Sequence, residues 1–150
     1  MDRYDYMKRA ISLGEIAYRL HEIPVGCVIV KDGKIIAEAN NQTEHEKSAL
    51  HHAEIIAIEK ASKALNSPNL TGCELYVTLE PCPMCAGAII NSKVSKVVFG
   101  AFDRNYGACG TAMNLFSADN IHKPECYGGI MEDECTKLLK DFFNDLRGKS

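Results

Sequence analysis

The sequence predicts an α/β domain in which helices cover both faces of a mixed β-sheet. Two long segments, one near each end of the chain, repeat apolar residues at steps of three and four, which is typical of amphipathic helices. Between them, a β-branched run meets Asp32-Gly33, a dipeptide that favours tight hairpin turns. A strand, a short apolar helix and another strand then follow within residues 73–99, which indicates a right-handed crossover between parallel strands.

Each element has its own local signal. The first helix has an apolar stripe beginning at Met7, and the last has acidic residues early and basic residues late, as the helix dipole prefers. In order, we expect helices at 2–20, 52–65, 82–91 and 132–147, strands at 24–30, 35–40, 73–79, 94–99 and 125–130, and loops at 41–51 and 100–119. The second loop is rich in Gly, Ala and Asn, and we interpret it as a functional loop, with a short helix as the alternative.

The composition is that of an ordinary globular protein. Its 150 residues fit one domain covering 1–150, with 46% hydrophobic and 25% charged residues. The net charge of −3 argues against a protein coated with basic residues for nucleic acid, although a local basic patch is compatible with it. No apolar run approaches the roughly 18–20 residues of a membrane helix, and no apolar signal core follows Met1. We therefore expect a cytoplasmic protein with no membrane association.

The seven cysteines are an odd count, which favours reduced thiols or metal ligands over a disulfide framework. Cys27, Cys73 and Cys135 fall in apolar patterns, and we expect them to be buried as small hydrophobic residues. Only Cys82 and Cys85 have the spacing of metal ligands. Because they lie three apart at the start of a helix, they can bind one ion, and the positive end of that helix favours their thiolates.

Two short stretches indicate the chemistry. His52-Ala53-Glu54 and Pro81-Cys82-Pro83-Met84-Cys85 together give His-x-Glu followed by Pro-Cys-x-x-Cys, the signature of zinc-dependent nucleobase deaminases. The His-x-Glu spacing selects His52 over its neighbour His51 as the third ligand beside the two thiolates. Three protein ligands leave one coordination position open, which is the arrangement of a catalytic rather than a structural zinc. The sequence therefore predicts one Zn²⁺ per subunit.

Glu54 is the predicted proton shuttle. Zinc acidifies its water towards a pKa of about 7 and so yields hydroxide as the nucleophile. Attack on the amidine carbon of an aminopurine or aminopyrimidine also requires protons on a ring nitrogen and on the departing amine, and one non-ligand carboxyl can transfer both. Residues two apart diverge on a regular helix, so His52 and Glu54 can meet only at a helix start. A zinc ribbon needs a second ligand pair that the sequence lacks, and a thioredoxin-like redox pair leaves His52 and Glu54 unexplained.

Several further segments give the chain a family resemblance together with these motifs. They are Pro24-Val25-Gly26, Asn41, residues 76–88 and residues 97–101. On them the chain resembles the cytidine deaminase superfamily, and most closely the bacterial tRNA-specific adenosine deaminases, which convert the wobble adenosine of an anticodon to inosine. The resemblance implies a three-layer α/β/α cytidine-deaminase-like fold, a single zinc-dependent deaminase domain, and a homodimer that binds a tRNA anticodon stem-loop.

The resemblance also implies contacts with the substrate. Asn41 and the backbone of Ala53 are expected to hydrogen-bond the flipped base, and an amide that donates and accepts at once suits a purine edge. Val25 and Leu79 are expected to wall the pocket, and Asp103 to lie beside a ribose. Three of these assignments have a plainer alternative, which is a loop cap for Asn41, core packing for Leu79 and a turn cap for Asp103.

Two departures from the family pattern leave this chemistry intact but weaken the case for a particular RNA. Ser48-Ala49-Leu50-His51 stands where the family usually has Asp-Pro-Thr-Ala, and Asn105 stands where it usually has a lysine. A deaminase of a free base or nucleoside, such as guanine, cytosine or cytidine, is an alternative function that the acidic net charge favours. A non-catalytic RNA-binding or zinc-binding subunit is a third, and Glu54 argues against it because a binder has no use for a proton shuttle.

Overall fold

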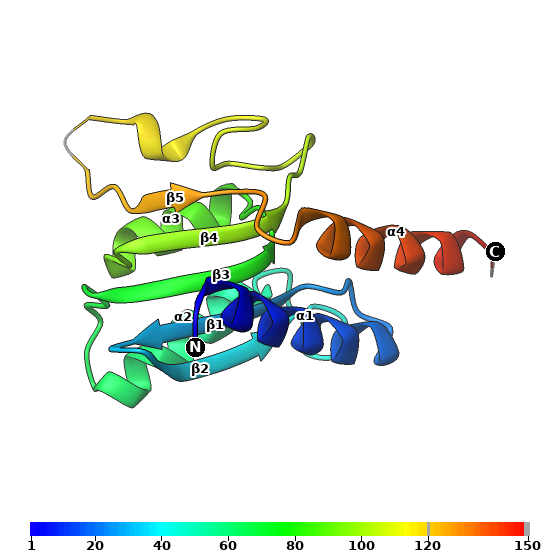
Figure 1. Ribbon diagram of the computed structural model, residues 1–150, viewed down its shortest axis with the longest axis horizontal. Coiled ribbons are helices and arrows are strands. Elements are labelled where there is room, and N and C mark those ends of the chain that lie inside the picture. The colour runs from blue at the N-terminus through cyan, green and yellow to red at the C-terminus, as the bar shows by residue number, and fades with distance from the viewer. Residues whose placement is uncertain (120, 149–150) are drawn as a thin grey trace.

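The computed structural model describes residues 1–119 and 121–148. A five-stranded mixed sheet lies between two layers of helices (Figure 1). The helices are α1 (Arg3–Arg19), α2 (Ala53–Leu65), α3 (Pro83–Ser92) and α4 (Glu132–Gly148), the strands are β1 (Gly26–Lys31), β2 (Lys34–Asn40), β3 (Cys73–Leu79), β4 (Lys96–Ala101) and β5 (Glu125–Tyr127), and η1 (Leu115–Ser117) is a 3-10 turn. The predicted three-layer α/β/α class is confirmed.

The strand order is β2-β1-β3-β4-β5. β1 pairs antiparallel with both β2 and β3, whereas β3, β4 and β5 run parallel. The turn between β1 and β2 has positive φ at Asp32 (51°) and Gly33 (76°), as the Asp-Gly pair predicted. α3 forms the crossover between β3 and β4. β4 begins two residues later than expected, because Lys96 is its first residue that pairs with β3, opposite Glu74.

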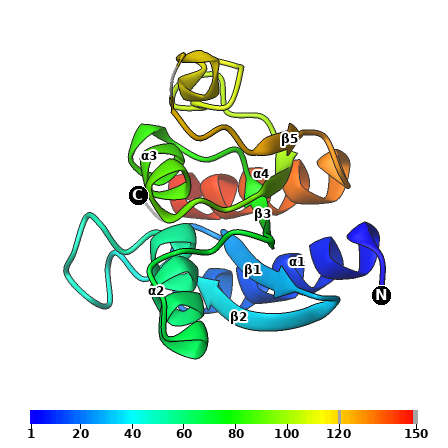
Figure 2. The same cartoon turned by 90° about the vertical axis from the view of Figure 1, so that its left-hand side faces the viewer.

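The two faces of the sheet have separate cores. α2 and α3 cover one face, and α1 and α4 cover the other (Figure 2). Cys27 and Cys73 are buried in the first core and Cys135 in the second, as predicted. α1 packs very close to β1. A Cβ atom built at Gly26 would lie 1.9 Å from the carbonyl oxygen of Ala10, so no side chain fits between them. Only glycine permits that approach.

The strand register gathers the loops that matter at one edge of the sheet. Gly26 pairs with Asn40, Cys27 pairs with Val77, and Leu79 pairs with Ala101. The segments that lead into β1 and away from β2, β3 and β4 therefore meet at the same edge, where α2 and α3 also begin. Substrates of open α/β sheets commonly bind outside the carboxyl ends of parallel strands.

The long segment after β4 is a loop as predicted, apart from η1. The side chain of Asn114 caps this turn by accepting from the backbone N–H of Phe116 at 3.0 Å. The short helix that was the alternative is thus present, but only as three residues. Across residues 1–119 and 121–148, no helix combines the length and the apolar character that a membrane crossing requires.

Candidate metal centre and active site

His52, Cys82 and Cys85 converge although thirty residues separate the histidine from the first cysteine. Their ligand atoms all lie within 4.8 Å of one another. Nδ1 of His52 is 3.6 Å from Sγ of Cys82 and 3.5 Å from Sγ of Cys85. Zinc–sulfur and zinc–nitrogen bonds of tetrahedral sites place such atoms about 3.5–3.6 Å apart. The donor set and its spacing therefore fit a Zn²⁺ ion.

Two helix starts present these ligands. His52 is the N-cap residue of α2 with extended backbone (φ −68°, ψ 155°), and Cys82 is the N-cap residue of α3 (φ −76°, ψ 174°). Neither side chain caps its own helix, so both are available to the cluster. Pro83 at the first turn of α3 suits this entry. The helix start that His-x-Glu requires is thus observed, and the positive ends of two helices face the thiols.

The two thiols share negative charge unequally. Hydrogen bonds with Cys85 and, to a smaller extent, with His52 lower the pKa of Cys82 to about 4. The same hydrogen bond and burial raise the pKa of Cys85 well above its ordinary value. The pKa of His52 is raised, chiefly by its hydrogen bond to Cys82. A dication at this point offsets the repulsion between two thiolates, which is the charge balance that a zinc site uses.

Glu54 lies in the first turn of α2, beside this cluster. It is only 4% exposed, and burial raises the pKa of its carboxyl to about 7. The charge of His52 and the side chain of Cys85 offset part of this rise. A carboxyl that titrates near neutral pH can both accept and donate a proton at working pH, which general acid–base catalysis requires.

A cavity of about 500 Å³ opens onto these groups. The sequence-predicted residues that line it are Val25, Asn41, His52, Ala53, Glu54, Leu79, Cys82 and Asp103, and the others are Ile23, Thr43, Ala49, Glu80, Pro83, Met84 and Tyr106. Of the predicted residues, Cys85 alone is absent from the lining, and it is completely buried. The structure thus brings all the predicted site residues together at one place.

Asn41 has an unpartnered buried carbonyl. Its side-chain Oδ1 accepts no hydrogen bond from the described residues, although the residue is only 5% exposed. Its backbone N–H donates to the carbonyl of Val25, which holds the residue at the cavity wall. A buried polar oxygen without a partner costs about 1–3 kcal/mol. The side chain does not cap the loop, so its hydrogen-bonding capacity is available to a ligand.

Asp103 and Leu79 have structural contacts in addition to their place in the lining. Oδ1 of Asp103 accepts from the backbone N–H groups of Asn105 and Tyr106 at 3.0 and 3.1 Å, so the turn-capping alternative is observed. Leu79 packs against the hydrophobic cores on both faces of the sheet. Neither contact prevents the side chain from facing a ligand in the cavity.

Two buried glutamates that sequence reasoning missed hold the loops around the cavity. Glu80, 2% exposed, accepts from the backbone N–H groups of Asp103, Cys109 and Thr111 at 3.1, 3.1 and 3.2 Å. Glu22, 1% exposed, accepts from the backbone N–H groups of Glu44 and His45 and from the His45 ring. The position of Glu80 between an apolar strand and Pro81 signals a buried acidic residue, because a strand that is apolar on both faces offers no exposed position for its side chain.

Cys109 in the loop after β4 and Cys126 in β5 form a thiol pair to which the sequence assigned no role. A hydrogen bond between the two raises the pKa of Cys109 and lowers that of Cys126. Both half-buried side chains pack against the core beneath α2 and α3. They therefore link the loop to β5.

Comparison with known proteins agrees with this geometry. A family model for the cytidine and deoxycytidylate deaminase zinc-binding region matches residues 1–101. The chain is 49% identical over 145 residues to a tRNA-specific adenosine deaminase of Bacillus subtilis, covering 96% of this chain and 90% of that protein. Its structure resembles one from studies of A-to-I editing by tRNA:A34 deaminases at the wobble position of transfer RNA, with a TM-score of 0.87, 38% identity, and coverage of 90% and 99% of the two chains. A guanine deaminase from Bacillus subtilis matches with a TM-score of 0.67 and 39% identity, covering 74% of this chain and 71% of its own.

Proposed function

The chain belongs to the cytidine and deoxycytidylate deaminase zinc-binding family, and we propose that it hydrolyses the wobble adenosine of a tRNA anticodon to inosine and ammonia. The observation that carries the proposal is that Glu54 lines the same cavity as His52 and Cys82, which form one cluster with the buried Cys85. The likeness to tRNA-specific adenosine deaminases along almost the whole chain selects the substrate.

His52, Cys82 and Cys85 are the proposed zinc ligands, through Nδ1 and the two Sγ atoms. When bound, zinc supplies a Lewis acid that makes water a nucleophile near neutral pH. Metal analysis of His51→Ala and His52→Ala proteins tests the ligand assignment. Zinc should be lost from the second variant and retained by the first, and the reverse result would transfer the role to His51.

Glu54 is proposed to move the protons of the reaction. Its carboxylate takes a proton from the attacking water and delivers it to the ring nitrogen beside the amino group. Glu54 then takes the proton of the hydroxyl group now on that carbon and gives it to the amino group as the carbon–nitrogen bond breaks, so that adenosine and water give inosine and ammonia. The raised pKa of Glu54, caused by burial, suits a group that alternates between base and acid.

The remaining cavity residues are proposed to hold the flipped base. Asn41 offers an amide with an unpartnered carbonyl, and the backbone N–H of Ala53 lies in the first turn of α2, where no carbonyl within the helix is available to it. Val25 and Leu79 supply apolar walls. Asp103 lies beside the ribose in this proposal, using the carboxylate oxygen that does not cap its own turn.

Deamination of a free base or nucleoside is the second candidate, because the guanine deaminase of Bacillus subtilis is 39% identical over the part that it covers. The test is to incubate the zinc-loaded protein with an unmodified anticodon stem-loop bearing wobble adenosine and, separately, with guanine, cytosine, cytidine and adenosine. Inosine in the stem-loop without turnover of the free compounds supports the proposal. Turnover of a free compound with an inert stem-loop favours the alternative.

We also propose that the protein is a cytoplasmic homodimer with tRNA touching both subunits. One side of α3 carries small or apolar half-buried residues at helical spacing, namely Met84, Gly87 and Ala88. Gly87 has open space around it, because a Cβ built there meets no atom within 4 Å. Sedimentation analysis of Gly87→Arg tests this interface. A shift from dimer to monomer supports it, and an unchanged dimer would place the contact elsewhere.

A further inference from the structure

Tyr106 is an aromatic side chain at the rim of the cavity that contains Glu54. It lines this cavity and yet is 66% exposed, whereas Glu54 and Asn41 in the interior are 4% and 5% exposed. Within residues 1–119 and 121–148, its ring makes no hydrogen bond and packs against no other aromatic ring. Phe102, four residues earlier, instead packs edge-on against Phe99 with ring centroids 5.1 Å apart. A flat apolar surface left in water beside a binding cavity is stabilised when a ligand covers it.

The backbone under Tyr106 is held in place. Oδ1 of Asp103 accepts from the N–H of Tyr106, and the carbonyl of Asp103 accepts from the N–H of Gly107 at 2.9 Å. A Cβ at Gly107 would lie 2.4 Å from that carbonyl oxygen and 2.5 Å from the Glu80 carboxyl, so only glycine fits this turn. Because the turn is ordered before any ligand arrives, little conformational entropy is lost when the ring is covered.

An enzyme that acts on one base of an RNA must first separate that base from its neighbours. A neighbour that loses its stacking partner exposes an apolar ring face, and aromatic side chains commonly replace the lost partner in single-stranded RNA recognition. Resting on the proposed function, we propose that Tyr106 stacks on a base next to the wobble adenosine. Its place at the rim, rather than in the interior, assigns it to a flanking base and not to the reacting one.

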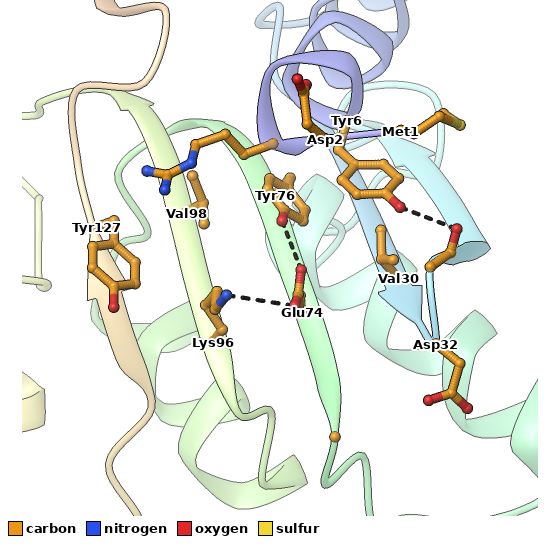
Figure 3. A pocket seen from close by; sticks show the side chains of 13 residues that line it. Met1, Asp2, Tyr6, Val30, Asp32, Glu74, Tyr76, Lys96, Val98 and Tyr127 are labelled. Carbon is orange, nitrogen blue, oxygen red and sulfur yellow. Dashed lines mark hydrogen bonds and ion pairs between the residues drawn. The ribbon is translucent and has the colours of Figure 1, made fainter.

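The ring, rather than the hydroxyl group, is what the proposal requires. Tyr106→Phe should retain kcat/KM on the stem-loop within about twofold, whereas Tyr106→Ala should lose roughly 5- to 150-fold, the range for loss of one base–aromatic stack. Tm should be unchanged in both, since the side chain is mostly exposed. Tyr127 is the matched control, because it is 45% exposed and lies in a hollow on the α1 and α4 side of the sheet with Val98 and Lys96 (Figure 3). Equal activities of Tyr106→Ala and Tyr127→Ala would overturn the proposal.

The stacked base can be identified by removing bases from the RNA. Two stem-loops are compared, abasic at the nucleotide on one side or the other of the wobble adenosine. The penalty of Tyr106→Ala should disappear in one of them and persist in the other, because a lost stack cannot be lost twice. A penalty that persists in both would show that Tyr106 acts without stacking on a neighbouring base.

Contact between residue 106 and the RNA can be measured by tryptophan fluorescence without background, because the chain contains no tryptophan. Tyr106→Trp and Tyr127→Trp each introduce one, and the stem-loop should quench the first and leave the second unchanged. If Tyr106→Trp forms inosine without quenching, the stacking proposal fails and the proposed function stands. If the wild-type protein neither binds nor deaminates the stem-loop, both fail.

Discussion

Replacing Glu80 by glutamine should release the loop that forms one side of the active-site cavity. The Glu80 carboxylate is buried and satisfies three backbone N–H groups of this loop, with Oε1 accepting from Asp103 and Oε2 from Cys109 and Thr111. Glutamine has nearly the same shape but only one acceptor oxygen. If that oxygen takes the place of Oε2, the amide NH₂ faces the N–H of Asp103, and two donors then oppose each other.

The size of the effect follows from these contacts. Hydrogen bonds to a charged acceptor contribute about 1.5–3 kcal/mol each and neutral ones about 0.5–1.5 kcal/mol. Glu80→Gln loses one bond outright and weakens two, a sum of about 3.5–6 kcal/mol, and relief of the buried charge offsets part of it. We therefore expect the free energy of local opening of this loop to fall by about 2–4 kcal/mol.

Hydrogen exchange measures this loss at the amides concerned. In Glu80→Gln, the amides of Cys109 and Thr111 should exchange roughly 30- to 1000-fold faster, the equivalent of that free energy. kcat/KM should fall while bound zinc is retained. Glu125→Gln, at an exposed position of β5, is the control and should change neither the exchange of these amides nor kcat/KM. Unchanged protection of these loop amides would refute the conclusion that Glu80 holds the loop.

Three further predictions test other parts of the site. Asn41→Ala should lower kcat/KM on the stem-loop by roughly 5- to 150-fold without lowering Tm, because it removes a buried oxygen that no described group satisfies; a loss of Tm with normal turnover would contradict this. Burial tends to raise the pKa of Glu22, but hydrogen bonds from His45 prevail and lower it, so its contribution to stability is present above the ordinary pKa of 4.5 and is lost as pH falls through the lower folded value. Urea unfolding should therefore show a shallower acid loss of stability in Glu22→Gln than in wild type, and identical pH profiles would refute the assignment. Gly107→Ala should reduce both Tm and activity because its Cβ has no room, whereas Gly148→Ala, at the end of α4, should leave Tm unchanged, and equal Tm values for the two would count against the geometry.

Much of the fold follows from local signals in the sequence. Asp32-Gly33 predicts the hairpin because few residues adopt positive φ easily, and the apolar surroundings of Cys27 predict its burial. The order of the strands does not follow in the same way. The antiparallel pairing of β1 with β3 joins segments more than forty residues apart, and nothing local to either strand specifies it.

The same difference between local signals and long-range contacts applies to the candidate site. His52 and the two cysteines are recognisable because metal ligation restricts both residue type and spacing. The position of Glu80 after an apolar strand signals its burial, but the loops that Glu80 and Glu22 hold are not predictable. Their partners are backbone N–H groups of distant loops, which any sequence can supply. η1 is also hard to predict, because a turn of three residues has no periodicity to detect.

The central claim is that Glu54 transfers protons beside a zinc ion held by His52, Cys82 and Cys85. It is tested most directly by measuring inosine formation in the stem-loop by Glu54→Gln protein whose zinc content is determined in the same sample. We predict about one zinc per chain, as in wild type, with turnover reduced by roughly 10²- to 10⁴-fold, the usual contribution of a general acid–base group. Wild-type turnover by the zinc-loaded variant would contradict the account.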